Sequence, residues 1–129
     1  VGNKDFIGRA LRLRKMLGGG LRQVGVVASC GMFALKNNIK RLQEDHNNAK
    51  LLAEGLASIS QLKVEYGESQ TNMVFVNCPK SHREPLTSFL LENKIVISSL
   101  DRGRFVCHLG INNKDIRFVV EVFREYFNQ

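Results

Sequence analysis

Apolar side chains recur every three or four positions through the first sixty residues. The pattern covers residues 5–16, 21–36 and about 39–59, and each of these segments predicts one helix. Three glycines at positions 18–20 separate the first two, because a glycine run extends a helix poorly. The second helix is almost wholly apolar, which predicts burial in a core or a subunit interface. In the third, His46 stands in the apolar stripe, which favours a core or interface histidine over a ligand or proton shuttle.

After residue 60 the apolar pattern changes to the alternation that is typical of β-strands. Residues 62–66 alternate, residues 67–70 predict a turn, and residues 73–76 are rich in β-forming side chains. Two neighbouring, paired strands are therefore expected, and Pro79 ends the second one.

The last third predicts two helices and two strands. Pro85 starts a helix that continues to residue 93, strands are expected over residues 95–97 and 104–109, and Asn112 or Asn113 caps a final helix. Three helices followed by β, β, α, β, β, α predict an α+β fold, in which helices cover a small antiparallel or mixed sheet.

The composition is that of an ordinary globular chain. The 129 residues are 43% apolar and 24% charged, which predicts one domain or two small lobes. No apolar run is long enough for a membrane span, and no secretory leader pattern is present. Cys30, Cys78 and Cys107 are too few and too widely spaced for a disulfide framework or a zinc site. We expect three reduced core thiols, no metal, and a cytoplasmic or mitochondrial-matrix protein.

The net charge of +7 is unevenly distributed. Residues 1–41 carry nine basic residues and one acidic residue, a net charge of +8, whereas residues 42–129 carry a net charge of −1. Such an asymmetry predicts a local anion, namely a phosphate, a carboxylate or a nucleic acid.

Two places on the chain are candidates for anion binding. Lys15 and Arg22 flank the glycines at a predicted helix start, where free N–H groups and the helix dipole favour a phosphate. Solvated charges on a flexible helix hairpin are the alternative. Arg104 opens an alternating strand and could clamp a carboxylate with both arms of its guanidinium, although a surface arginine at a strand end is the simpler interpretation.

A family resemblance favours anion binding over the simpler alternatives at both places. In order along the chain, VGNKDFI (1–7), RLRKMLGGGLRQVG (12–25), ALKNN (34–38), RLQEDH (41–46), TNMVF (71–75) and RFVCHL (104–109) closely resemble the low-specificity L-threonine aldolases. The block KMLGGGLRQ is the most specific, and the resemblance covers essentially all 129 residues.

The resemblance implies a pyridoxal-phosphate enzyme of the aspartate-aminotransferase fold (fold type I), usually a tetramer built as a dimer of dimers. Such enzymes act in amino-acid metabolism, where they cleave threonine or allo-threonine to glycine and acetaldehyde. The resemblance further implies that Lys15 and Arg22 serve the cofactor phosphate by reaching across a dimer interface, and that Arg104 holds the substrate carboxylate. Residues 1–38 would end the large cofactor-binding domain, and residues 39–129 would form a long connecting helix and the small domain.

The resemblance also implies that the Schiff-base lysine lies shortly before the position that matches Val1. Lys4 matches a variable surface position of the family, so we do not assign the Schiff-base role to it. We therefore expect the C-terminal portion of a threonine aldolase, with no catalytic residue of its own and no activity alone. The alternatives are a small basic nucleic-acid-binding module and an oligomerisation module. The first lacks an aromatic stacking platform or a reader motif, so neither nucleic acid nor membrane is an expected partner.

Overall fold

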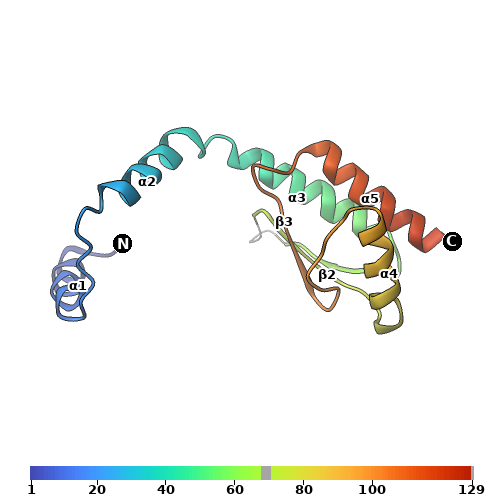
Figure 1. The fold of residues 1–129 in the computed structure, drawn as a ribbon, viewed down its shortest axis with the longest axis horizontal. Helices are drawn as coiled ribbons and strands as arrows, with labels where there is room; N and C mark the ends of the chain where they lie inside the picture. The colour runs from blue at the N-terminus through green and yellow to red at the C-terminus, as the bar shows by residue number, and fades with distance from the viewer. Residues whose placement is uncertain (68–70, 129) are drawn as a thin grey trace. The chain divides into compact units, whose positions relative to one another are not determined.

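The computed structural model describes residues 1–67 and 71–128 and divides the chain into two compact units, Val1–Ile39 and Lys40–Gln129. The first unit contains α1 (Lys4–Met16) and α2 (Gly25–Asn37) (Figure 1). The second contains, in chain order, α3 (Leu42–Ala57), β1 (Lys63–Glu65), β2 (Met73–Asn77), α4 (Lys80–Glu92), β3 (Gly103–Val106) and α5 (Asn113–Asn128). Of the predicted turn at 67–70, residues 68–70 lie outside the described residues. Within the described chain, no helix has the length and apolar content that crossing a membrane requires.

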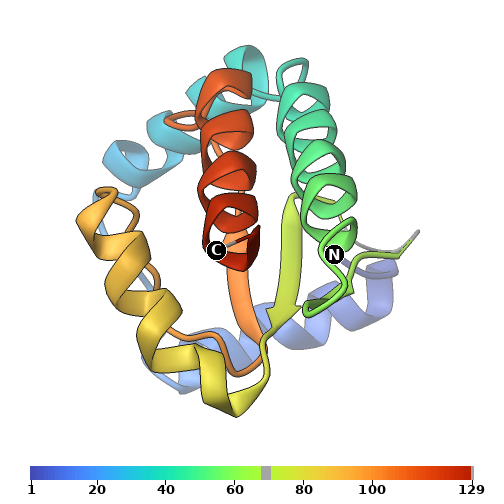
Figure 2. The ribbon, with the colours of Figure 1, turned by 90° about the vertical axis from the view of Figure 1, so that its right-hand side faces the viewer.

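The second unit is a three-stranded antiparallel sheet with its helices packed on one face. The strand order is β1-β2-β3, so the two predicted strands at 62–66 and 73–76 do pair as neighbours. Helices α3 and α5 run side by side over one face of the sheet, and α4 packs against α5 (Figure 2). The predicted α+β class is confirmed.

The core of this unit is closed by its own residues. Fully buried side chains come from α3, β2, α4 and α5, among them Leu56, Val74, Leu86 and Phe123. The buried side of α3 differs from the predicted stripe, because it starts at Asp45, while Leu42 is exposed and His46 is only half-buried. Burial of an acidic residue is possible here because Arg41 binds both of its carboxylate oxygens.

The first unit buries none of its side chains. The side chain of Asn3 caps α1 by accepting a hydrogen bond from the Phe6 N–H at 2.9 Å. No residue of α1 or α2 is buried, so the predicted burial of the second helix is not found in the chain as described. That helix also begins at Gly25 rather than at residue 21, because Gln23 has a left-handed φ of 51°.

One predicted strand is absent. Residues 95–97 are irregular, because the Ile95 N–H donates to the Leu90 carbonyl (2.8 Å) and the Lys94 N–H to the Leu91 carbonyl (2.9 Å). With Lys94 at φ 62°, these bonds form the cap that ends α4, so the segment packs by its side chains instead of joining a strand ladder. Helix α4 also starts at Lys80, and Pro85 lies inside it rather than at its start.

The last strand and helix follow the sequence more closely. Strand β3 ends at Val106, three residues earlier than predicted. The Asn112 side chain accepts hydrogen bonds from the backbone of Lys114 and Asp115, and the Asp115 carboxylate accepts one from the Asn112 N–H at 2.9 Å. This reciprocal cap selects Asn112 from the two predicted candidates and fixes the start of α5.

Candidate functional site

The glycine turn after α1 is a helix cap. Gly18 has a φ of 78°, its N–H donates to the Lys15 carbonyl, and the Gly19 N–H donates to the Arg14 carbonyl at 2.8 Å. These two bonds form a Schellman motif, which satisfies the last carbonyls of the helix. The Gly18 and Gly19 N–H groups are therefore not free for an anion, and the glycines do not open α2 directly. This part of the predicted phosphate site is wrong.

The cations of this turn remain in place. Lys15 lies in the last turn of α1, and a Cβ added at Gly20 would come within 3.2 Å of its Nζ. A side chain at Gly20 would therefore require the flexible end of Lys15 to shift slightly. Arg22 is exposed two residues further on. In the described part of the chain, neither cation lies within ion-pair distance of a carboxylate.

Arg104 lies in the second unit, on the sheet face that no helix of this unit covers. We call this the open face; its strand side chains are Lys63, Glu65, Met73, Phe75, Asn77, Arg104 and Val106. The register places Glu65 on β1, Phe75 on β2 and Arg104 on β3 in one cross-strand row. Arg104 is exposed, and among the described residues no carboxylate lies within ion-pair distance of it. Its guanidinium is thus available to a ligand.

Arg102 is engaged by its neighbours, in contrast to Arg104. Its Nε donates to Glu65 Oε2 at 3.1 Å, and its Cζ lies 4.8 Å from the centre of the Phe75 ring. The backbone at Arg102 has a left-handed φ of 50°. Sequence reasoning missed the Glu65 and Phe75 partners, although the alternation of the two predicted strands would have placed both side chains on one face.

The turn before β3 is tightly packed and held by side-chain contacts. Gly103 is buried, and a Cβ there would overlap the carbonyl oxygen of Ser99. The Ser99 hydroxyl accepts a hydrogen bond from the Asp101 N–H at 2.9 Å, and Arg83 pairs with Asp101 at 2.8 Å. The conformation of this turn therefore determines the positions of Arg102, just before β3, and of Arg104, within β3.

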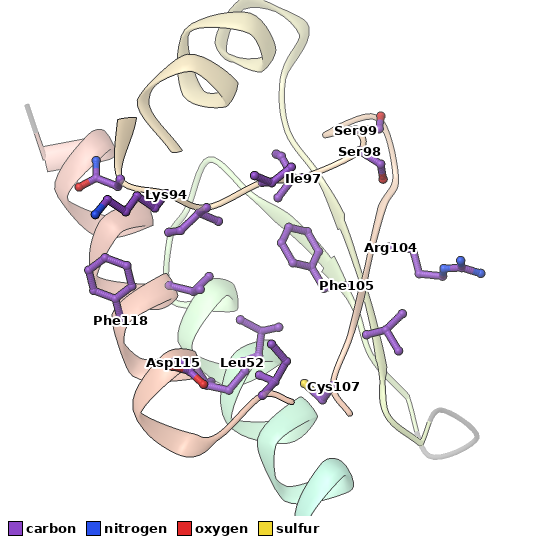
Figure 3. A pocket seen from close by; sticks show the side chains of 17 residues that line it. Leu52, Lys94, Ile97, Ser98, Ser99, Arg104, Phe105, Cys107, Asp115 and Phe118 are labelled. Atoms are coloured by element: carbon purple, nitrogen blue, oxygen red, sulfur yellow. The ribbon is translucent and has the colours of Figure 1, made fainter. Parts of the chain in front are cut away.

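A cavity of about 630 Å³ lies on the other side of β3, toward the helices. Its lining is mostly apolar and comes from β3, the 93–99 segment and α5, with Phe105, Ile97 and Phe118 among its residues (Figure 3). Arg104 borders the cavity, but Figure 3 shows its side chain extending away from it. The cavity and the Arg104 guanidinium are thus separate features.

The three cysteines differ in environment. Cys78 and Cys107 are buried free thiols, as predicted, whereas Cys30 is exposed and the prediction of a core thiol is wrong for it. Burial raises the pKa of the Cys107 thiol to about 11, and the Asp45 carboxylate adds to the rise. Cys107 is therefore a neutral thiol at physiological pH and a poor nucleophile. In the described chain, no three His, Cys, Asp or Glu side chains gather closely enough to hold a metal ion.

Asn72 links the start of β2 to the end of β3. Its side-chain amide donates to the Cys107 carbonyl at 2.8 Å, and its own carbonyl accepts from the Cys107 N–H at 2.8 Å. The two bonds extend the ladder between β2 and β3 beyond the last regular pair, Met73 and Val106. They hold β3, and with it Arg104, against the sheet.

Known proteins match this chain over nearly its whole length. Residues 1–79 match the family model described as beta-eliminating lyase. The "Low specificity L-threonine aldolase" of Escherichia coli O157:H7 is 39% identical over 126 residues, which is 98% of this chain and 37% of that protein. "Low-specificity L-threonine aldolase 1" of Arabidopsis thaliana is 38% identical over 130 residues, 97% of this chain and 36% of that protein.

The chain thus spans a little more than a third of the length of these relatives. The resemblance found in the sequence motifs is confirmed as a likeness to threonine aldolases. Because the family model covers more than half of the 129 residues, the chain belongs to the beta-eliminating lyase family.

Proposed function

We propose that these residues form part of a pyridoxal-phosphate-dependent aldehyde-lyase that cleaves threonine or allo-threonine to glycine and acetaldehyde. The names of the relatives support this reaction class. The observation that carries the proposal is Arg104, whose guanidinium has no carboxylate partner in the described chain although Glu65 lies in its own row of the sheet. A planar, two-armed donor left free in this way fits the α-carboxylate of an amino acid.

The residues of the first unit fit the phosphate of the cofactor. Lys15 and Arg22 supply two exposed cations, and Gly20 adds no side chain beside the Lys15 Nζ. Charge-assisted hydrogen bonds from these groups would hold the phosphate oxygens. When bound, pyridoxal phosphate supplies the electron sink for the electron pair that remains on Cα as the Cα–Cβ bond breaks.

The chain's own residues then have two tasks. Lys15 and Arg22 retain the cofactor through its phosphate, and Arg104 binds the substrate carboxylate and orients the amino acid. Orientation contributes to the rate because a held substrate has already lost its rotational freedom. None of the three takes or gives a proton in this proposal.

The same proposal covers the architecture. The chain would be the C-terminal portion of a fold type I enzyme, with residues 1–38 ending the large cofactor-binding domain and residues 39–129 forming the connecting helix and small domain. The first unit exposes large apolar side chains, including Val27, Met32, Phe33 and Leu35, which supports packing against further protein. We propose a homo-oligomer, a dimer of dimers, that works in the cytoplasm.

A polypeptide of residues 1–129 alone should form no glycine from threonine, even with added pyridoxal phosphate. The resemblance implies that the lysine that anchors the cofactor precedes the position that matches Val1. Coupled detection of acetaldehyde would test this. Turnover comparable with that of an intact aldolase would contradict the assignment of the missing lysine.

The role of Arg104 is tested in the whole protein that carries these residues. Arg104→Ala and Arg104→Lys should both lower kcat/KM for threonine by about 2–4 kcal/mol of transition-state stabilisation, with the cofactor still bound. Arg117→Ala, which removes the same charge from the exposed side of α5, is the matched control. Full efficiency in Arg104→Lys, or loss of cofactor in both variants, would show that Arg104 is not the carboxylate clamp.

A further inference from the structure

The open face places an acidic residue within reach of Arg104. Glu65 and Arg104 occupy the same cross-strand row, with Phe75 between them. Neighbouring strands lie about 4.8 Å apart, so the two Cα atoms are separated by roughly 10 Å. A glutamate and an arginine side chain extended toward each other can bridge that distance. Without another partner, Glu65 would compete with any carboxylate that approaches Arg104.

Arg102 prevents this by occupying Glu65. Its Nε lies 3.1 Å from Glu65 Oε2, and its guanidinium lies over the Phe75 ring, 4.8 Å from the ring centre. The side chain thus crosses β2 above the residue that separates Glu65 from Arg104. The cation–π contact and the ion pair act on the same guanidinium and hold it in this position.

The backbone holds Arg102 in a conformation that non-glycine residues rarely adopt, with φ at 50°. The adjacent turn is tightly packed, because Gly103 lies against the Ser99 carbonyl without room for a Cβ. A rare backbone conformation that the surrounding structure enforces is often linked to function. Here it directs the Arg102 side chain across the sheet while Arg104 points outward from β3.

We propose that Arg102 is a positioning residue. It holds the Glu65 carboxylate over Phe75 and thereby keeps Arg104 free for the substrate carboxylate. This inference rests on the proposed carboxylate role of Arg104. Removing Arg102 should release Glu65 to pair with Arg104, so that the enzyme inhibits its own carboxylate site. Removing Glu65 as well should restore the site.

Steady-state kinetics of the whole, cofactor-loaded protein test the functional half. Arg102→Ala should raise KM for threonine about two- to fivefold, the range that one competing exposed ion pair supports, with kcat changed less than twofold. The double variant Arg102→Ala/Glu65→Gln should return KM to within twofold of the wild-type value, and Arg117→Ala should leave it unchanged. A wild-type KM in Arg102→Ala, or no recovery in the double variant, would overturn the proposal.

Side-chain NMR of the 129-residue chain tests the structural half without any reaction. In Arg102→Ala, the Arg104 Nε–H resonance should shift downfield and sharpen as it gains Glu65 as a partner, and Glu65→Gln should abolish the change. An unshifted Arg104 resonance would overturn the proposal whatever the kinetics show. If the resonance shifts but Arg104→Ala leaves KM unchanged, the proposed function fails while the Arg102 contact stands.

Discussion

Gly55 is a position where adding one methyl group should disturb the packing between two helices of the second unit. It lies in α3 opposite α5, and a Cβ added there would come within 2.6 and 2.8 Å of the two Val120 γ-carbons and 3.3 Å of its Cβ. Two effects of Gly55→Ala oppose each other. Alanine favours the helix by about 1 kcal/mol over glycine, whereas overpacking costs about 1–3 kcal/mol.

The geometry decides between these two effects. A valine in a helix has one strongly preferred rotamer, so Val120 cannot turn both γ-carbons away cheaply. Val120 is also buried, with 6% of its surface exposed. The helices must therefore move apart. With the gain in helix propensity subtracted from the cost of overpacking, we expect Gly55→Ala to lower the free energy of unfolding by about 1–2 kcal/mol.

Urea unfolding followed by far-ultraviolet circular dichroism measures this change, with an unaltered m-value as a check on two-state behaviour. Gly31→Ala is the control, because nothing lies within 4 Å of a Cβ added in the middle of α2. Adding Val120→Ala to Gly55→Ala should give a favourable coupling of about 1 kcal/mol, since the γ-carbons are gone. A stabilised Gly55→Ala with additive behaviour in the double variant would refute the packing argument.

Three further predictions concern single groups. In the whole protein, Arg22→Ala should weaken pyridoxal-phosphate binding by about 1.5–3 kcal/mol in an equilibrium titration, and an unchanged Kd would place Arg22 elsewhere. Asp45→Asn, which removes the negative charge that pairs with Arg41, should lower the urea midpoint clearly more than Glu54→Gln, whose 3.8 Å pair with Lys50 is exposed. Burial raises the pKa of the Cys107 thiol from about 9 in the unfolded chain to about 11 in the folded chain. The free energy of unfolding should therefore fall as the pH rises from 9 to 11, by at most about 2–3 kcal/mol, and it should fall less in Cys107→Ala.

The fold class could be predicted from the sequence because the second unit satisfies its own pattern. The alternation at residues 62–66 and 73–76 became β1 and β2, and the apolar face of residues 113–128 became the buried side of α5. Local rules also limited the cap of α5 to Asn112 or Asn113, since a side-chain cap needs only its own helix start, and the structure has Asn112 as the cap. Features determined by neighbouring residues were predictable.

The errors arose where two local signals competed or where a distant residue decided. Residues 95–97 have the composition of a strand, but the Ile95 N–H is already used to cap α4. Asp45 is buried because Arg41 neutralises it, and a pattern of apolar residues does not predict a buried acidic residue. The partner of Arg102 lies 37 positions away on β1, so only the strand register could reveal it.

The two candidate sites therefore differ in how they are stabilised. Arg104 lies on a strand whose neighbouring strand, preceding turn and covering helices all belong to the second unit. Its position therefore depends on a hydrophobic core that is formed by residues of that unit. Lys15 and Arg22 sit at the end of a helix that buries no side chain in the chain as described. Helices of this length are marginal in water without packing, so the phosphate-binding half of the proposed function depends on protein that covers α1 and α2, whereas the carboxylate-binding half does not.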